Sequence, residues 1–238
     1  MNLDALWHDL ECGDYAEDLP LWRELAQSAG GPVIDVGAGT GRVTLDLARA
    51  GIAVIAVDIE QRLLDALAKR ANGLPITTLT ADVRELPPGP PAGLIVVPMQ
   101  TLQMLGGRAG RAAFLAAALG RLRPGGLLAA ALADPVACFD DEHPDPPPPA
   151  TCEIGGVHYS TQLLGVTPDG TLHRRRTIGG EAYDVATRLD RVTPDEVADQ
   201  AEAAGYVREP DREIPETERY LGSTVVLLRA SSASGDAA

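Results

Sequence analysis

Cysteine is scarce in this 238-residue chain and shows no pairing pattern. The three cysteines, Cys12, Cys138 and Cys152, are widely scattered and none belongs to a CxxC pair. This distribution excludes a disulfide framework and gives no sign of a metal site. We expect small buried or idle thiols, with a Cys138–Cys152 bridge only if the fold brings those two residues together.

Basic charge is also scarce. Lys and Arg number 20 against 34 Asp and Glu, which gives a formal net charge of -14. A field of this sign repels phosphate backbones and anionic membrane surfaces, and no Lys/Arg run interleaved with aromatic residues offsets it. We therefore expect no nucleic-acid partner and no membrane partner, and we favour a small molecule as the substrate.

Long apolar runs and a secretory leader are missing as well. The longest apolar stretches, residues 92–99 and 127–133, fall well short of a membrane span. The first residues, MNLDALWHDLECGDYAED, are acidic where a secretory signal would be basic. The sequence predicts a soluble, cytoplasmic protein that is a monomer or a homodimer.

The first half of the chain alternates short β-branched runs with Ala/Leu-rich segments. Near-continuous apolar strands separated by helices indicate a parallel sheet covered on both faces, and the right-handed crossover rule makes it doubly wound. The strands are expected at residues 32–36, 52–57, 75–79, 94–97 and 126–131, and the helices at 42–50, 61–71 and 109–122.

The pattern changes after Asp134. Residues 140–150, DDEHPDPPPPA, predict a stiff exposed loop. Residues 157–166, 171–177 and 182–192 alternate like an antiparallel meander. Thr193 and Pro194 then open a helix that ends at Gly205, and residues 223–229 form a last strand.

These segments suggest a division of the chain. Residues 1–134 are expected to form the α/β core with an N-terminal helical cap. Residues 135–192 are expected to form a small antiparallel β insertion that walls the substrate site. Residues 193–230 supply the last helix and strands of the same sheet, and residues 231–238 a disordered tail.

A glycine-rich loop, Asp35-Val36-Gly37-Ala38-Gly39-Thr40-Gly41, lies between the first strand and the first helix. Glycines there allow close backbone approach to a ligand, and the following helix N-terminus offers free amide donors. The dinucleotide fingerprint GxGxxG requires a third glycine at position 42, where this chain has Arg. The observed pattern is GxGxG, which counts against a nicotinamide cofactor.

Two carboxylates follow the next strands. Asp58 ends the second strand, where a carboxylate beside a glycine loop can accept both hydroxyls of a ribose. Asp82 lies just beyond the third strand, where its side chain could accept from an adenine amino group. The alternatives are a solvated strand-end residue for Asp58 and a turn or helix cap for Asp82.

The ordered segments VIDVGAGTGRVTLDLA, AVDIE, ADVREL and LRPGGLLAAAL resemble the motifs of class I S-adenosylmethionine-dependent methyltransferases, over roughly residues 12–230. The resemblance implies a Rossmann-like α/β fold, with a doubly wound, mainly parallel seven-stranded sheet and a small antiparallel insertion after strand five. It also implies S-adenosyl-L-methionine as the cofactor and no metal. The implied cofactor-binding residues are Tyr15, Asp35, Gly37, Ala38, Gly39, Thr40, Gly41, Asp58, Ile59, Ala81, Asp82, Val83, Pro98, Met99 and Gln100.

Within that resemblance, the glycines would pass beneath the methionine part, Asp58 would hold the ribose, and Asp82 with Val83 the adenine. Asp35 would anchor the amino-acid end. Tyr15 either caps the cofactor or packs beside Trp22.

The acceptor is less defined. Residues 98–101 correspond to the segment that lines the methyl-transfer site in the family. The chain lacks both the Asn-Pro-Pro-Tyr motif of base and amide methylation and the cysteine motif of carbon-5 pyrimidine enzymes. The meander resembles that of small-molecule N- and O-methyltransferases, including enzymes that methylate amino sugars. The cluster at 174–176, three arginines, either attracts an anionic acceptor or belongs to a solvated edge strand.

No general base is assigned. The candidates are His143, His158, His173, Asp18 and Glu17. Two other functions stay open: an NAD(P)-dependent oxidoreductase, disfavoured by Arg at 42 and by the lack of Tyr-x-x-x-Lys, and a catalytically silent protein that binds an adenosyl cofactor.

Overall fold

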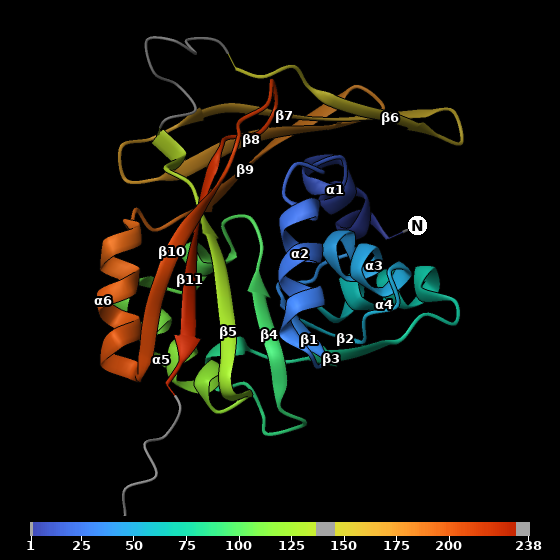
Figure 1. Ribbon diagram of the computed structural model, residues 1–238. Helices are drawn as coiled ribbons and strands as arrows, with labels where there is room; N and C mark the ends of the chain where they lie inside the picture. The colour runs from blue at the N-terminus through green and yellow to red at the C-terminus, as the bar shows by residue number, and fades with distance from the viewer. Residues whose placement is uncertain (1, 137–145, 232–238) are drawn as a thin grey trace, which may run out of the picture.

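The computed structural model describes residues 2–136 and 146–231, which form two sheets and the helices around them (Figure 1). The larger sheet has seven strands in the order β10-β11-β5-β4-β1-β2-β3. Its strands are β1 Val33–Val36, β2 Val54–Asp58, β3 Ile76–Thr80, β4 Ala92–Val97, β5 Leu122–Leu132, β10 Tyr206–Ile214 and β11 Ser223–Ala230.

The five strands β1 to β5 pair in parallel, whereas β11 is antiparallel to β5 and to β10. Helices cover both faces of this sheet. The described helices are α1 Leu3–Cys12, α2 Leu19–Ala29, α3 Arg42–Arg49, α4 Gln61–Ala71, α5 Gly107–Leu119 and α6 Pro194–Ala204, with short 3₁₀ turns η1 Val83–Glu85 and η2 Thr101–Met104. The expected doubly wound, mainly parallel seven-stranded sheet is confirmed.

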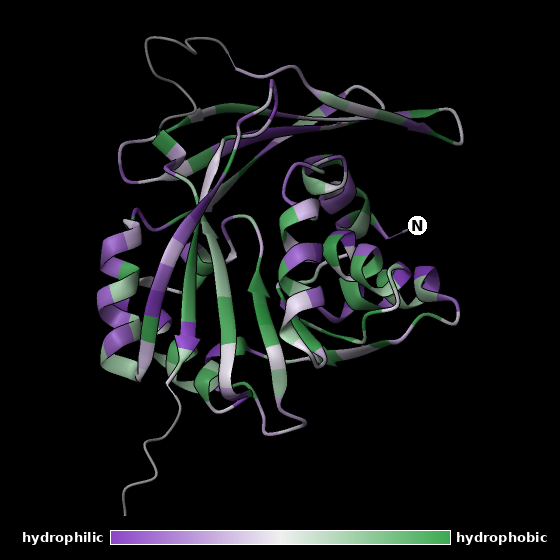
Figure 2. Cartoon of the chain, in the orientation of Figure 1, coloured by the Kyte–Doolittle hydropathy of each residue, from purple (hydrophilic) through white to green (hydrophobic). Residues whose placement is uncertain are grey.

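Alternate residues along the strands belong to two separate cores. Ile34 and Val36 of β1 pack with Phe114 of α5, whereas Val33 packs with Trp22 of α2. Strand β4 is buried throughout, as its unbroken apolar sequence predicts. Figure 2 shows the contrast between the apolar strands β4 and β5 and the mixed surface of the small sheet.

The second sheet is antiparallel, with the order β6-β7-β8-β9. Its strands are β6 Ala150–Ile154, β7 Val157–Val166, β8 Thr171–Ile178 and β9 Glu181–Arg188. It lies above the carboxyl ends of the parallel strands, and α1 lies between it and the core (Figure 1). Strand β6 was not expected from the sequence, because the preceding prolines obscure its short alternation.

Several boundaries differ from the expectation. The helix expected at 109–122 ends at Leu119, and Leu122 already pairs with Ala92. The pairing then shifts to Leu94 with Leu127, so Pro124-Gly125-Gly126 forms an irregularity inside β5 rather than a turn before it. Strand β10 contains Pro210, which it tolerates because it is an edge strand whose pairing shifts between Glu209 and Arg212.

Part of the expected proline-rich loop, residues 140–145, and most of the expected tail, 232–238, lie outside the described residues, as does Cys138. Cys12 and Cys152 are free thiols. No helix in the described part of the chain combines the length and apolarity needed to cross a membrane.

Candidate functional site

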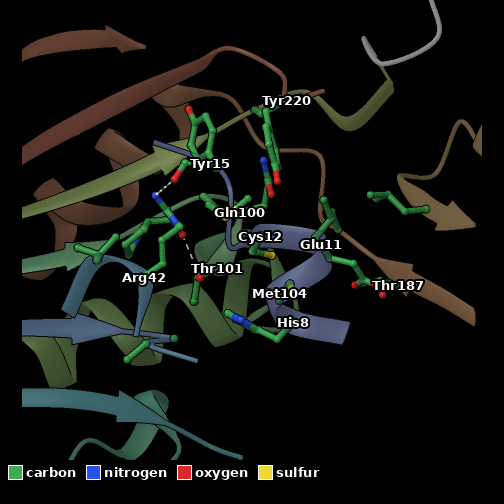
Figure 3. A pocket seen from close by; sticks show the side chains of 18 of the residues that line it. His8, Glu11, Cys12, Tyr15, Arg42, Gln100, Thr101, Met104, Thr187 and Tyr220 are labelled. Carbon is green, nitrogen blue, oxygen red and sulfur yellow. Dashed lines mark hydrogen bonds between the residues drawn. The ribbon is translucent and has the colours of Figure 1, made fainter. Parts of the chain in front are cut away.

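A cavity of about 580 Å³ lies between the carboxyl ends of the parallel strands, α1 and the small sheet (Figure 3). We call its wall at residues 35–38, 42, 58–59, 81–84 and 98–101 the strand-end half. We call its wall at residues 161, 163, 172, 174, 187 and 189 the small-sheet half. The predicted residues that line the cavity are Tyr15, Asp35, Gly37, Ala38, Asp58, Ile59, Ala81, Asp82, Val83, Pro98, Met99 and Gln100.

Gly39, Thr40 and Gly41 were also predicted to bind the cofactor, but they are not among the lining residues. Gly39 has φ +54, and a Cβ there would lie 2.1 Å from Nε2 of His8. Gly41 begins α3, and a Cβ there would meet Leu67 at 2.3 Å. These two glycines therefore let α1 and α4 pack against the loop.

Asp58 holds the glycine loop at the end of β2. Its Oδ2 accepts from the Gly39 amide at 2.8 Å, and its Oδ1 accepts from the Glu60 amide at 2.9 Å. The side chain is buried and lines the cavity. Each carboxylate oxygen can accept a second hydrogen bond, so Asp58 fixes the loop and retains acceptor capacity toward a ligand hydroxyl. The interpretation as a solvated strand-end residue is therefore wrong.

Asp35 carries an unused acceptor. Its Oδ2 accepts from the Thr44 hydroxyl at 2.6 Å, while Oδ1 is buried with no partner among the described residues. Burial raises the pKa of Asp35 to about 7, although the Thr44 hydrogen bond opposes the shift. A buried acceptor without a donor is costly, and a ligand ammonium would satisfy it.

Asp82 is more occupied than expected. It caps η1 by accepting from the Arg84 amide at 2.9 Å, and the Arg84 guanidinium lies 2.6 Å from Oδ2. These hydrogen bonds hold the pKa of Asp82 below its ordinary value. The side chain lines the cavity as well, so the helix-cap alternative is present together with the expected position.

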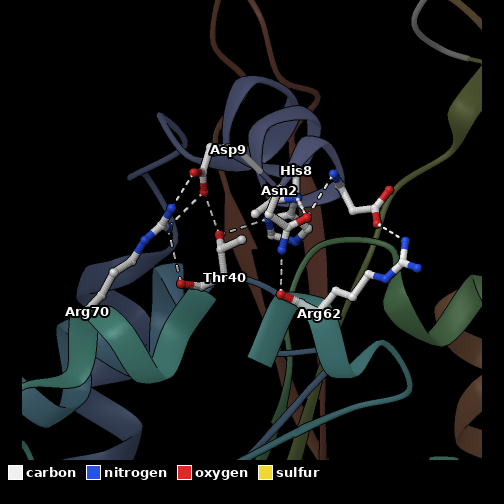
Figure 4. A network of polar contacts seen from close by, with 8 residues as sticks. Asn2, His8, Asp9, Thr40, Arg62 and Arg70 are labelled. Atoms are coloured by element: carbon white, nitrogen blue, oxygen red, sulfur yellow. Dashed lines mark hydrogen bonds and ion pairs between the residues drawn. The ribbon is translucent and has the colours of Figure 1, made fainter. Parts of the chain in front are cut away.

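Helix α1 is tied to the glycine loop by a polar network (Figure 4). The Thr40 hydroxyl donates to Asp9 at 2.6 Å, and the Arg70 guanidinium donates to the same carboxylate at 2.5 and 2.9 Å. His8 Nδ1 lies 3.1 Å from the Thr40 oxygen. Because the Thr40 proton goes to Asp9, we assign the proton between His8 and Thr40 to Nδ1. Burial lowers the pKa of His8, so the ring is neutral and Nε2 carries a lone pair.

Arg42 has a structural role that the glycine pattern did not reveal. Its guanidinium forms a buried two-point ion pair with Asp18, in which Nη2 of Arg42 lies 2.7 Å from Oδ2 of Asp18. Nη1 of Arg42 also donates to the Tyr15 carbonyl at 2.9 Å. In the sequence, the only sign of this structural role is the position of Arg42 directly after Gly41. Tyr15 belongs to the same apolar cluster as Trp22 and also lines the cavity, so packing near Trp22 is confirmed and the contact with a cofactor stays a prediction.

The loop before β11 contributes Tyr220, which the sequence did not single out. The rings of Tyr15 and Tyr220 lie 4.8 Å apart, and both hydroxyls are buried without a partner among the described residues. Both residues line the cavity (Figure 3). Burial raises the pKa of Tyr15 to about 12, so its hydroxyl is a neutral donor.

Residues 98–101 turn sharply at the end of β4. Met99 has a φ of 54°, in the left-handed region that favours glycine. The turn is held by Thr101, whose hydroxyl donates to the Pro98 carbonyl at 3.0 Å. Such strained backbone is characteristic of sites where geometry matters more than stability.

The candidate bases do not meet in the cavity. His158, His173 and Glu17 are exposed and outside its lining, and His143 lies outside the described residues. Asp18 is committed to Arg42. His8 and Glu11, which were not considered, do line the cavity.

The arginine cluster lies on β8, an interior strand of the small sheet, so the edge-strand alternative is wrong. Arg176 makes a two-point pair with Glu11 of α1 at 2.8 and 3.0 Å and lies over the Trp7 ring at 5.3 Å. Trp7 also meets Tyr159 and Tyr183 edge-on. This contact attaches the small sheet to α1.

Comparison with known proteins agrees with this geometry. The family model described as a methyltransferase domain matches residues 33–126, from β1 into β5. No curated protein matches the sequence significantly. The similar solved structures described below are under 25% identical, so they show the fold alone.

Three of these structures are representative. The sugar N-methyltransferase KedS8 from a Streptoalloteichus species is 15% identical, over 96% of this chain and 92% of its own, with a TM-score of 0.77. The CcbJ methyltransferase from Streptomyces caelestis is 21% identical, over 92% and 98%, with a TM-score of 0.70. The amino pentose methyltransferase CalS10 from Micromonospora echinaspora is 17% identical, over 97% of each chain, with a TM-score of 0.69.

Proposed function

We propose that the chain, whose residues 33–126 match a methyltransferase domain, is an S-adenosylmethionine-dependent methyltransferase that methylates an N or O nucleophile of a small molecule. The observation that carries the proposal is the cavity itself. Its volume of about 580 Å³ lies within the range of small-molecule sites, roughly 300–1,000 Å³. The small sheet covers the strand ends, which supports a compact acceptor.

The residues of the strand-end half fit the cofactor. Asp35 Oδ1 is a buried acceptor in need of a donor, and Asp58 retains capacity for a hydroxyl beside Gly39. A Cβ at Gly37 would lie 2.7 Å from the Thr101 side chain, so the loop has no room for a side chain where it borders the cavity. In this assignment Asp35 receives the cofactor's ammonium, Asp58 its ribose, and Asp82 with Val83 its adenine.

When bound, S-adenosylmethionine supplies a sulfonium-activated methyl group, so the protein's task is to orient the acceptor and exclude water. Orientation of this kind can lower a barrier by roughly 7–11 kcal/mol. The strained turn at Met99 and the small sheet, which covers the strand ends, help to orient the acceptor and to exclude water. The names of the structural neighbours, a sugar N-methyltransferase and an amino pentose methyltransferase, favour an amine nitrogen as the nucleophile.

The test combines binding with turnover. Calorimetry should show S-adenosylmethionine binding, and Asp58→Ala should weaken it about tenfold or more, because two hydrogen bonds that fix the loop and the acceptor for the ribose are lost together. Asp65→Ala, on the exposed face of α4, is the matched control and should bind normally. Release of S-adenosylhomocysteine is then measured over a panel of small amines and alcohols.

The competing functions give different results. Stabilisation by NAD(P)H and not by S-adenosylmethionine would replace the proposal with an oxidoreductase. Tight cofactor binding without turnover of any panel member would favour a silent adenosyl-binding protein.

A further inference from the structure

The three consecutive arginines on β8, residues 174–176, differ in the carboxylate with which each one pairs. Arg175 points to the outer face of the small sheet and forms a two-point pair with Asp184 at 2.7 and 2.9 Å. Arg176 points to the inner face and pairs with Glu11. Arg174 shares that inner face and lines the cavity. The alternation of the strand therefore places Arg174 and Arg176 on the same inner face, and of the three arginines Arg174 lines the cavity.

Arg174 has no such partner. Within residues 2–136 and 146–231 its guanidinium makes no hydrogen bond, and its one carboxylate contact is Glu11 Oε2 at 4.0 Å. That oxygen already accepts from Arg176 at 3.0 Å. The Arg174 side chain is only 25% exposed. A guanidinium keeps its charge at any ordinary pH, so a largely buried one without a hydrogen-bonded partner is costly unless a ligand supplies the anion.

The chain does not lack carboxylates that could have paired with Arg174, since acidic residues outnumber basic ones by 34 to 20. At the other end of the cavity, Asp58 accepts from backbone amides, Asp82 pairs with Arg84, and the buried Oδ1 of Asp35 belongs to the strand-end half. The unpaired cation is therefore a local feature of the small-sheet half. Its surroundings are Leu163, Leu172 and Leu189, with the hydroxyls of Thr161 and Thr187. Thr161 donates to Glu11.

We propose that Arg174 binds an anionic group of the acceptor, a carboxylate or a phosphate, and that the acceptor has an apolar body lying along the leucines of the small-sheet half. The inference rests on the proposed function, because it describes the second substrate of the same cavity. A guanidinium binds both anions through paired N–H donors, and in a protein with a net charge of -14 this local cation offsets the general repulsion of anions.

The experiment uses the full-length protein saturated with S-adenosylhomocysteine and three probes of similar size. The probes are phenylacetate, phenyl phosphate and the neutral 2-phenylethanol, each titrated by calorimetry or ligand-observed NMR. At least one anionic probe should bind about tenfold more tightly than the neutral probe. Comparison of the two anions distinguishes a carboxylate from a phosphate acceptor.

Variants then assign the preference to Arg174. Arg174→Gln should remove the preference for the anion, and Arg174→Lys should retain part of it because the charge stays. Arg175→Gln, on the same strand but the outer face, should keep it in full. Equal binding of charged and neutral probes, no binding of any probe, or a preference that survives in Arg174→Gln would overturn the inference.

The titration of S-adenosylhomocysteine separates this inference from the proposed function. If S-adenosylhomocysteine fails to bind, the methyltransferase proposal fails, and the anion preference is still measured in the same samples. If it binds normally and the anions show no preference, only the role of Arg174 fails.

Discussion

The two halves of the cavity are built in different ways. In the strand-end half, polar contacts join residues near in sequence: Asp58 is 19 residues from Gly39, and Asp35 is 9 residues from Thr44. In the small-sheet half, Glu11 contacts Arg176 and Thr161 across 165 and 150 residues. The strand-end half is a rigid scaffold formed by the seven-stranded sheet. The small-sheet half comes from a separate sheet, and its position depends on contacts with α1.

This difference means that the outer wall of the cavity can change while the site at the strand ends stays the same. The carboxyl ends of parallel strands meet at one edge, where they create a ligand site whatever the outer wall contains. The wall can vary without disturbing that edge, because one of its polar anchors in the described chain, Glu11, belongs to neither sheet.

The largest effect on cofactor binding should come from adding a side chain to the glycine loop of the strand-end half. Gly39→Val places a β-branched residue at φ +54, with its Cβ 2.1 Å from His8, so the loop or α1 must move. Overpacking and the unfavourable φ should weaken S-adenosylmethionine binding about 100-fold, as measured by calorimetry.

The control for Gly39→Val is Gly51→Ala, which has φ +83 and open space around the added Cβ. It carries the backbone strain without the collision. It should lose some stability and keep cofactor affinity. Equal loss of affinity in both variants would show that the packing of α1 on the loop is unimportant.

A smaller effect should come from removing the ion pair that joins α1 to the small sheet. Glu11→Gln leaves Arg176 and Arg174 without a nearby carboxylate and should cost about 2 kcal/mol in the free energy of unfolding, as loss of hydrogen bonds to a half-buried charge does. Amides of β7 and β8 should exchange faster with deuterium, while cofactor affinity changes little.

Asp184→Asn is the matched variant for Glu11→Gln, because Asp184 pairs with the neighbouring Arg175 on the outer face. That pair is about half exposed on both sides, so solvent and salt screen it and it should contribute little to stability. If the two variants destabilise equally, the contact between Glu11 and Arg176 does not hold the small sheet in place.

The same contrast separates what the sequence predicts from what it does not. The positions of the parallel strands, the glycine loop and the carboxylates at Asp58 and Asp82 follow from local patterns, since apolar periodicity and loop spacing are local properties. The bulge at Pro124 and the edge strand with Pro210 were not predicted, because pairing decides whether such residues are tolerated.

The small-sheet half escaped prediction for a related reason. An arginine run has the same appearance whether it is solvated or buried, and only the interior position of β8 and the distant Glu11 distinguish Arg174 from its neighbours. The same holds for His8, Arg42 and Tyr220, whose roles depend on contacts between segments far apart in the chain. Thr40 was assigned to the ligand, yet its hydroxyl binds α1.

The finest test concerns the protonation of Asp35 within the scaffold. The pKa of about 7 that burial gives this group means that much of it is protonated in the free protein below pH 7. A cofactor ammonium favours the charged carboxylate, so binding should release a proton below pH 7. Affinity should rise at most about tenfold between pH 6 and pH 8 and level off above, since one pKa unit corresponds to a factor of ten.

Calorimetry in two buffers of different ionisation enthalpy measures the proton release. Asp35→Asn keeps an acceptor for the Thr44 hydroxyl but cannot ionise, so its affinity should be lower at pH 8 and nearly independent of pH. Folding stability gives an independent check. A carboxyl whose pKa is raised by folding stabilises the protein fully below about pH 4 and loses that contribution as the pH rises through 7, so the wild type should become less stable over this interval relative to the Asn variant. If proton release were the same in both proteins, Asp35 would not be the group that meets the ammonium, and the orphaned Oδ1 would need a buried water as its donor.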